Sequence, residues 1–429
     1  MTSLPGPAMT TVAAPAPTGP TPQAGPSEPA GPSQPLRPVY RESGYLRYIG
    51  GQAVSVLGDQ VWYVALSWTA VRLTSPGVAG AILAVSSLPR LILLLLGGAI
   101  VDRYGPRRLM IGSDLARAAV SLAAAAIALA RPGIGLLVVV ALVFGVADAV
   151  FLPAAGAIAP RLLRPEQLTG GAALNTLVAR IALTIGAPLG GLLVALGGLS
   201  LASAVNAATF VVSVVALSTL RPRDAAAPVR EPIGRSLRDG LRYLGRHPVL
   251  RALLAVSLLT NLGFVGPMNV GLAVVAERRD WGAGGIGLML AGFGLGAAAG
   301  ALAMTRLTVR SGPTMAVCAA VQGAAVFAVA LAPVPAVAAG ITAVAGITSG
   351  PLAVLIASIS QRQTDDGYRG RVASVQTLAN LGITPLAVAA MGAAVGWVGM
   401  VPAFGASACL ELAGAVICLA VPGLRTARR

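Results

Sequence analysis

The chain lacks lysine and is poor in histidine, cysteine and aromatic residues. Its 31 basic residues are all arginine, and aromatic residues make up only 4% of it. A nucleic-acid-binding protein would need a clustered basic face with aromatic rings on which bases can stack, so this composition argues against one. The three cysteines, Cys318, Cys409 and Cys418, all lie inside apolar runs, so no disulfide framework is expected.

The single histidine, His247, argues against several kinds of membrane-embedded enzyme. It stands beside Pro248 at the end of a polar stretch, where we expect a solvated loop residue. The chain contains no His-Glu-x-x-His zinc motif and no pair of aspartates in a Gly-x-Gly-Asp setting. The sequence therefore predicts a protein that is not an enzyme, with no metal site and no cofactor.

Charged residues are scarce as well, at 11%, whereas hydrophobic residues make up 56% and the mean hydropathy is +0.80. One soluble core could not bury so much apolar surface, so the bilayer must be the solvent for most of the chain. A helix needs roughly 20 apolar residues to span the membrane. Runs of that length recur near residues 46–70, 77–101, 109–130, 134–158, 171–196, 198–219, 251–275, 285–306, 314–332, 335–358, 373–395 and 398–420.

The arginines support this count of twelve. With the N-terminus inside, 24 of them fall inside, four outside and three within spans. Arginine near the ends of short loops is retained on the cytoplasmic side, so an even number of spans with both termini cytoplasmic is predicted. The four outside are Arg72, Arg131, Arg278 and Arg279.

A long basic loop divides the spans into two sets of six. Its second half, residues 236–250, places leucines on one face and arginines elsewhere, which predicts an amphipathic helix on anionic lipid headgroups. The first 38 residues contain 11 prolines, a composition typical of disorder. The predicted division is a disordered cytoplasmic tail at 1–40, a six-helix half at 41–220, a cytoplasmic linker at 221–250, a second six-helix half at 251–422 and a basic tail at 423–429.

Four ionisable residues lie near the predicted midplane of the first half. Asp59 stands about 13 residues up the first span and Arg90 about 13 residues down the second, so both reach a similar depth. Asp148 and Arg180, in the fourth and fifth spans, reach it too. We expect two pairs, Asp59 with Arg90 and Asp148 with Arg180. Such pairs either line a polar cavity or form static salt bridges that fix helix packing.

Other polar residues in the spans have a simpler interpretation. Asp114 and Arg117 are three positions apart on one helix, so a local pair is predicted. Glu411 has no basic residue at its depth, and we expect it to form hydrogen bonds, with a structural role. The spans of the second half are polar without being charged, as Asn261, Asn269, Gln322, Thr342 and Gln376 show.

The most specific local pattern is Gly98-Ala99-Ile100-Val101-Asp102-Arg103-Tyr104-Gly105-Pro106-Arg107-Arg108, between the second and third spans. Gly105 permits a tight turn, and Asp102 can bond to a helix N-terminus or to an arginine. The stretch resembles the signature loop of the major facilitator superfamily. That resemblance implies that Gly98, Asp102, Arg103, Gly105, Arg107 and Arg108 form a gating loop that latches the inward-closed state.

Three further stretches resemble the drug and siderophore exporter branch of that superfamily, which includes macrolide-efflux and enterobactin-export proteins. They are Gly51-Gln52 to Gly58-Asp59, Asn206-Ala207-Ala208-Thr209-Phe210, and Tyr368-Arg369-Gly370-Arg371-Val372. The resemblance covers nearly all of the chain after residue 40. It implies a cytoplasmic loop in the second half at Arg369, Gly370 and Arg371. It also favours Asp59 as the proton or cation site, because first spans line the cavity in this fold.

The fifth span carries a stretch close to the antiporter motif of exporters. It reads Gly186-Ala187-Pro188-Leu189-Gly190-Gly191, with Pro188 displaced by one residue from the usual Gly-Pro pair. Close helix packing through small residues is the other interpretation. The fourth span lacks the arginine that many proton-coupled drug exporters carry there, so proton coupling stays open.

The resemblance, taken with the composition, predicts a secondary active efflux transporter in the cytoplasmic membrane. It would export an antibiotic, a siderophore or another amphiphilic metabolite by alternating access, with a proton gradient as the driving force. Its partners would be the small-molecule substrate and membrane lipids, without nucleic acid, and we expect a monomer. The alternatives are an importer of the same fold, a lysolipid transporter and a transport-dead sensor.

Overall fold

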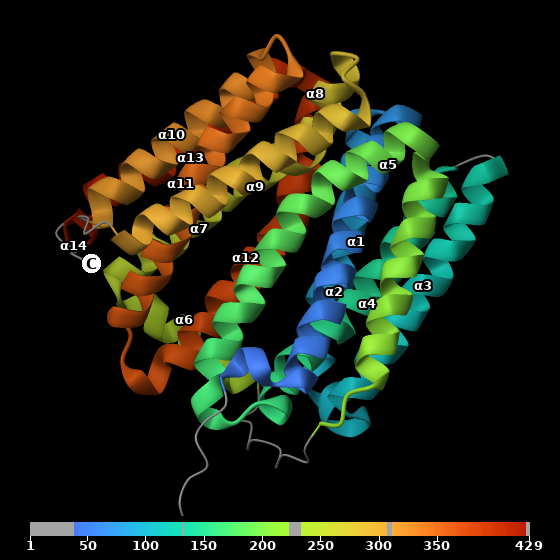
Figure 1. Ribbon diagram of the computed structural model, residues 1–429. Coiled ribbons are helices and arrows are strands. Elements are labelled where there is room, and N and C mark those ends of the chain that lie inside the picture. The colour runs from blue at the N-terminus through green and yellow to red at the C-terminus, as the bar shows by residue number, and fades with distance from the viewer. Residues whose placement is uncertain (1–37, 131–132, 223–232, 307–310, 426–429) are drawn as a thin grey trace, which may run out of the picture. The chain divides into compact units, whose positions relative to one another are not determined.

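The computed structural model describes residues 38–130, 133–222, 233–306 and 311–425, with their side chains except at 91–99, 102, 233–236 and 305–306. Most of the two predicted tails lies outside these ranges. The described part is helical and contains no strand (Figure 1).

The first half begins with a short 3-10 turn at Val39–Arg41 and continues in long helices. Proline opens two of them, at Pro76 and Pro106, where its missing N–H has no helical partner to lose. The helices are α1 (Ser43–Leu73), α2 (Pro76–Tyr104), α3 (Pro106–Ala130), α4 (Ile134–Leu162) and, after a 3-10 turn at Pro165–Gln167, α5 (Leu168–Ser218).

The 51 residues of α5 contain two spans. Gly197 and Gly198 leave the helical conformation, and Gly198 has a φ of 63°, which a residue with a Cβ rarely adopts. The chain reverses there, at the boundary that the sequence predicts between 171–196 and 198–219.

The second half follows the linker helix α6 (Ile233–Arg246). Its first span changes register at a π-helical turn, Pro267–Gly271, where proline removes a backbone donor. The elements are α7 (Pro248–Gly266), this turn, α8 (Leu272–Arg278), α9 (Gly282–Arg306), α10 (Ser311–Leu331), α11 (Pro335–Arg362), a 3-10 turn (Asp366–Tyr368), α12 (Arg369–Val398), α13 (Met400–Ala420) and α14 (Pro422–Arg425).

The predicted count of twelve spans is confirmed. Among the described residues, nine helical segments are long and apolar enough to cross a membrane. One of them, Pro165–Ser218, holds two spans, and α1 and α2 supply the remaining two. The fold is therefore the expected all-α arrangement with six spans in each half.

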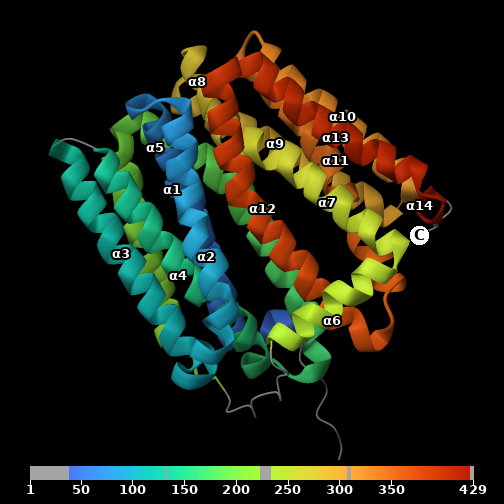
Figure 2. The same ribbon diagram turned by 180° about the vertical axis from the view of Figure 1, so that it is seen from behind.

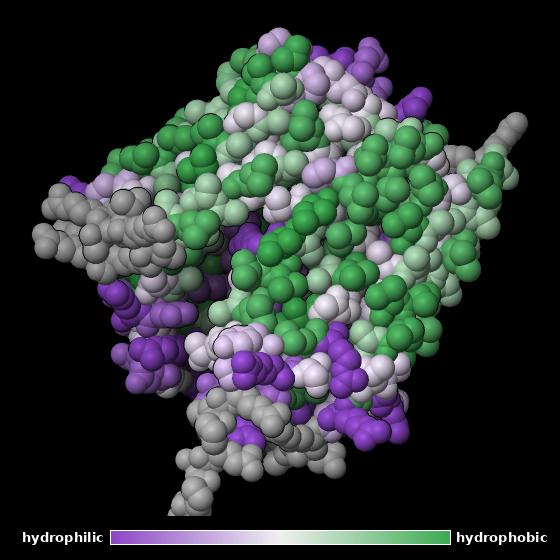
Figure 3. Space-filling model, in the orientation of Figure 1, coloured by the Kyte–Doolittle hydropathy of each residue, from purple (hydrophilic) through white to green (hydrophobic). Residues whose placement is uncertain are grey.

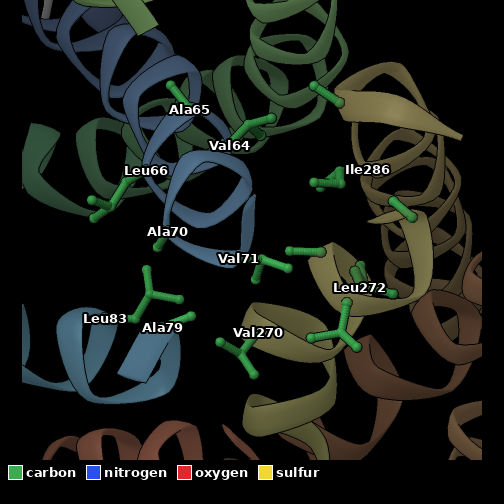
Figure 4. Close-up of a cluster of buried hydrophobic side chains, with 14 of the residues drawn as sticks. Val64, Ala65, Leu66, Ala70, Val71, Ala79, Leu83, Val270, Leu272 and Ile286 are labelled. Carbon is green, nitrogen blue, oxygen red and sulfur yellow. The ribbon is translucent and has the colours of Figure 1, made fainter. Parts of the chain in front are cut away.

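The two halves share a hydrophobic core at the end remote from the arginine-rich loops. This cluster joins Val71 of α1 and Leu83 of α2 to Val270 of the π-helical turn, Leu272 of α8 and Ile286 of α9. Figure 4 shows Val71 facing the Val270 and Leu272 side chains. At the arginine-rich end each half has a core of its own, with no residue from the other half. The halves are therefore joined at one end and separate at the other.

Glycines bring the backbones of the two halves into contact at the joined end. A Cβ on Gly80 of α2 would lie 3.0 Å from the Cα of Gly392 in α12. A Cβ on Gly191 of α5 would lie 3.1 Å from the Cα of Gly287 in α9. These helix pairs approach backbone to backbone because small residues leave room.

Large apolar side chains cover much of the outer surface, as membrane embedding requires. Figure 3 shows a broad hydrophobic band over α5 and its neighbours, with hydrophilic residues gathered at the arginine-rich end. Leu129, Leu196 and Leu295 are among the most exposed, at 79%, 70% and 64%. Such exposure would be an aggregation hazard in water and is normal in lipid.

The linker helix α6 packs against the second half, beside the N-terminal end of α12 (Figure 2). Leu244 is buried there, and the Tyr243 ring stacks on Tyr368 with centroids 4.4 Å apart. Arg371 lies 3.9 Å from Asp239. Part of the apolar face predicted to lie on lipid headgroups therefore contacts protein, and the headgroup contact stays a prediction.

The helix ends at Arg246, four residues before the predicted limit of 250. His247 is extended and precedes α7, which opens with Pro248. A residue before proline is driven out of the helical region, which explains the earlier end. His247 is half-buried, with its ring 4.2 Å from that of Tyr243.

Substituting Gly296 by leucine should destabilise the second half. Gly292, Gly296 and Gly300 of α9 pack against the backbone of α11, and a Cβ on Gly296 would lie 2.9 Å from the Cα of Ala343. We expect Gly296→Leu to lower the free energy of unfolding by roughly 1–3 kcal/mol through overpacking. Thermal unfolding in detergent measures it. Gly340→Leu on α11, whose Cβ would meet nothing within 4 Å, is the matched control and should stay near wild type.

Candidate functional site

A buried guanidinium, that of Arg117 in α3, joins three carboxylates of the first half. Its Nη2 lies 2.5 Å from Asp114 on the same helix. Its Nη1 lies 3.0 Å from Asp148 of α4 and 3.6 Å from Asp59 of α1. The side chains of Arg117 and Asp114 are 1% and 0% exposed, whereas those of Asp59 and Asp148 are 32% and 34% exposed. The cluster therefore has a buried base and two accessible acids.

Aromatic rings complete the surroundings of Arg117. The Arg117 Cζ lies 4.7 Å from the ring centroid of Phe151 in α4 and 4.5 Å from that of Phe210 in the second span of α5. A cation over an aromatic face is stabilised by the ring quadrupole, most strongly where water is excluded. The segment around Phe210, one of the exporter-like stretches, thus borders the charged cluster.

The cluster carries more acid than base. One guanidinium faces three carboxyl groups, so full ionisation would leave a net charge of −2 within the helix bundle. Excess charge in a low-dielectric setting is costly. The side chains of Asp59 and Asp148 are partly exposed and that of Asp114 is buried, so the first two are the carboxylates within reach of water.

The predicted pairing of these groups is wrong. Among the described residues, both Asp59 and Asp148 form ion pairs with Arg117, and neither forms one with Arg90 or Arg180. Arg90 is half-buried, and its Nε has no hydrogen-bond partner in the described part. Arg180 is exposed and lines a cavity between the halves. Counting residues along the spans predicts which residues lie at a similar depth in the membrane. It does not predict the direction in which each side chain points.

The local pair of Asp114 and Arg117 is confirmed, since their contact is the shortest in the cluster. It is not isolated, however, because the same guanidinium reaches two other helices. The i, i+3 spacing correctly predicted that pair. It did not indicate that Arg117 is also the base shared by Asp59 and Asp148.

A cavity of about 350 Å³ lies between the halves. Its described walls come from α1 and α5 of the first half and from α7, the π-helical turn and α9 of the second. Polar and aromatic groups mix there, which suits an amphiphilic guest. The main contributors are Gln60, Tyr63, Arg180, Phe264, Asn269 and Phe293.

A second cavity, of about 420 Å³, lies in the second half among α7, α11 and α12, with Gln322 contributed by α10. Ser257 and Asn261 both donate hydrogen bonds to Asn380 Oδ1, at 2.9 and 3.3 Å. Gln376 and Ser360 are hydrogen-bonded at 2.9 Å. Arg369 is the only charged residue among its described lining residues. Its wall therefore offers amides and hydroxyls rather than charge.

Glu411 forms the expected hydrogen bond. It is fully buried in α13, and its Oε1 accepts from Gln322 Nε2 at 3.2 Å. Gly263 and Gly323 make room for it, since a Cβ on either would lie within 3.1 Å of the Glu411 side chain. No described basic residue forms an ion pair with it.

The predicted gating loop connects α2 to α3. Gly105 ends α2 with a φ of 80°, which explains the need for glycine there. Arg107 donates from Nε to the carbonyl of Leu217 at 2.9 Å and from Nη2 to that of Ser218, at the end of α5. The loop is thereby tied to backbone carbonyls at the C-terminus of a helix.

The other loop residues divide into two groups. Arg103 and Arg108 are exposed, and the Arg103 guanidinium lies 5.4 Å from the Tyr104 ring centroid. Gly98 lies within α2, and the side chain of Asp102 lies outside the described part, so the expected roles of both stay predictions.

The loop of the second half is held by polar contacts at the start of α12. Arg369 lies 2.8 Å from Asp366 and donates to the carbonyl of Gln361 at 3.3 Å. The carbonyl of Gly370 accepts from Ser374 at 2.9 Å. With the contact of Arg371 to Asp239, this segment anchors the linker helix to the second half.

The antiporter-like stretch serves helix packing. Cβ atoms on Gly186 and Gly190 would lie 2.8 Å from the Gln60 side chain and 2.9 Å from Val61 Cα, both in α1. Gly191 faces α9, as described above. These glycines bring α5 close to α1 of its own half and to α9 of the other half.

Among the described residues, no group of three histidine, cysteine or acidic side chains is arranged to hold a metal ion.

Removing the Arg117 guanidinium should leave its carboxylates without a counterion. We expect Arg117→Met to lower the free energy of unfolding by about 3–5 kcal/mol, the cost typical of breaking a buried ion pair from one side. Thermal unfolding in detergent micelles measures it. Arg72→Met, at an exposed arginine of α1, is the control. Equal stability of both variants would show that the cluster is not held by Arg117.

Comparison with known proteins agrees with this fold. The family model described as Major Facilitator Superfamily matches residues 48–384. The multidrug efflux pump Tap of Mycolicibacterium fortuitum is 28% identical over 386 residues, covering 86% of this chain and 93% of that protein. The enterobactin exporter EntS of Citrobacter koseri is 27% identical over 308 residues, covering 70% and 72%. A crystal structure of a mutant of the nucleoside transporter NupG shares the fold, with a TM-score of 0.69, 14% identity and coverage of 88% and 99%.

Proposed function

Because the chain belongs to the major facilitator superfamily, we propose that it exports small amphiphilic organic molecules by proton antiport. The resemblance to the drug and siderophore exporter branch is confirmed, since relatives named as a multidrug efflux pump and an enterobactin exporter match most of the chain. It is a multi-pass membrane transporter and not an enzyme. The observation that carries the antiport proposal is the surplus of carboxylates around Arg117.

The orientation follows from the arginines. Cytoplasmic loops are enriched in arginine, so the arginine-rich end, together with both termini, lies in the cytoplasm. The halves share their core at the opposite end and have separate cores at this one. With this orientation, the shared core supports a state in which the halves are closed toward the outside and separate at the cytoplasmic end.

Proton exchange takes place at Asp59 and Asp148. Both accessible carboxylates attract the same guanidinium, and protonating either one weakens its tie to Arg117. Because Asp59 is on α1, Asp148 on α4 and Arg117 on α3, a change of charge alters the forces between these three helices. Proton binding can then favour one arrangement of the first half over another.

The substrate binds in the two cavities described above, against their polar and aromatic walls. The cavity between the halves offers Tyr63, Phe264 and Phe293 to apolar parts of a molecule. The cavity in the second half offers amides and hydroxyls. The walls favour molecules that combine rings or alkyl groups with neutral hydrogen-bonding groups, because an unpaired charge would lose its hydration there.

Efflux by the Asp59→Asn variant tests the proposal. Cells loaded with a panel of fluorescent or radiolabelled drugs would be followed with and without a protonophore. We expect wild-type efflux to fall to background when the gradient is dissipated, and Asp59→Asn to stay at background in both conditions. The asparagine keeps the shape of the side chain and removes its proton exchange.

Asp280→Asn is the matched control. Asp280 is an exposed residue of the outer loop with a φ of 55°, a conformation that asparagine tolerates well. It should export like wild type. Full efflux by Asp59→Asn, or wild-type efflux that ignores the protonophore, contradicts proton antiport through Asp59. Accumulation of the drugs in place of their loss contradicts export.

A further inference from the structure

A groove separate from the two cavities described above runs between α3 and α4. Its volume is about 440 Å³, and it lies on the part of these helices nearer the arginine-rich end. Figures 1 and 2 show α3 at the outside of the first half with α4 beside it. The lining residues are Arg108, Leu109, Gly112, Ser113, Ala116, Leu142, Val143, Val146, Ala147 and Val150.

The walls of this groove suit a hydrocarbon chain. Leu142 and Val146 are 40% and 45% exposed, so the groove is open to the surroundings of the bundle. A Cβ on Gly112 would meet nothing within 4 Å, which leaves the groove deep at that point. The Ser113 hydroxyl donates to the carbonyl of Ala147 at 2.9 Å and so needs no further acceptor. Apart from Arg108, the described walls present little but apolar surface.

Arg108 stands at the headgroup end of the groove. It is the third residue of α3 and is exposed, with no ion pair to a described acid. Its neighbour Arg107 is directed to the carbonyls of α5 and cannot serve the groove. A cation at the membrane surface above an apolar channel is complementary to a phosphate joined to an acyl chain.

We propose that this groove binds an anionic phospholipid, with an acyl chain along α3 and α4 and the phosphate at Arg108. The leaflet is the cytoplasmic one, an assignment that rests on the orientation proposed above. Arg108 also belongs to the gating loop, so the bound lipid restrains the segment between α2 and α3. The anionic lipid is then a specific ligand of the transporter as well as part of the bilayer that surrounds it.

Native mass spectrometry of the purified full chain tests this site. The protein would be titrated with phosphatidylglycerol or with phosphatidylcholine of the same acyl chains. We expect wild type to retain phosphatidylglycerol in preference to phosphatidylcholine. Arg108→Gln should weaken phosphatidylglycerol binding about fivefold, the effect of one arginine near the surface. Gly112→Leu should fill the groove and abolish retention of either lipid.

Gly135→Leu on the same α4 helix is the control, because a Cβ at Gly135 also meets nothing within 4 Å and lies outside the groove. It should bind like wild type. Val146→Trp fills the groove from α4 and replaces Gly112→Leu if that variant does not fold. Equal binding by the groove-filled variants and wild type, no preference for the anionic lipid, or a mass of two chains in place of bound lipid would overturn the proposal. Lipid retention is measured without transport, so failure of the lipid proposal can be distinguished from failure of the proposed antiport.

Discussion

The buried guanidinium of Arg117 is the constraint on which the first half depends. A charge within the bilayer must be compensated, and here the compensation comes from α1, α3 and α4, with aromatic rings from α4 and α5 around it. Four helices are therefore positioned by one side chain. Because the cluster holds more acid than base, it is also the observation on which the proposed proton coupling rests.

The described part of the second half has no buried arginine comparable to Arg117. Its cavity is lined by amides and hydroxyls that bond to one another, and its buried acid, Glu411, is paired with the neutral Gln322. In the proposed antiport the two halves have different roles. The first supplies the carboxylates around Arg117, and the second supplies a wall of amides and hydroxyls against which a neutral part of a substrate can lie.

Glycine contacts and a shared apolar core connect the halves. At the end remote from the arginine-rich loops, Gly80 meets Gly392 and Gly191 meets Gly287 backbone to backbone, while Val71 and Leu272 belong to one core. At the arginine-rich end, the separate cores, the bond of Arg107 to α5 and the docking of α6 hold each half together.

The sequence by itself determined the number of spans, their approximate positions and the reversal near Gly197 and Gly198, because hydropathy, arginine placement and glycine conformation are local properties. It also placed Asp59 and Asp148 at one depth. Only the tertiary structure decided that both carboxylates share Arg117. Depth along a helix follows from residue count, but the direction of a side chain depends on how each helix is rotated against its neighbours. That rotation is set by packing contacts between residues far apart in the chain, which no local pattern contains.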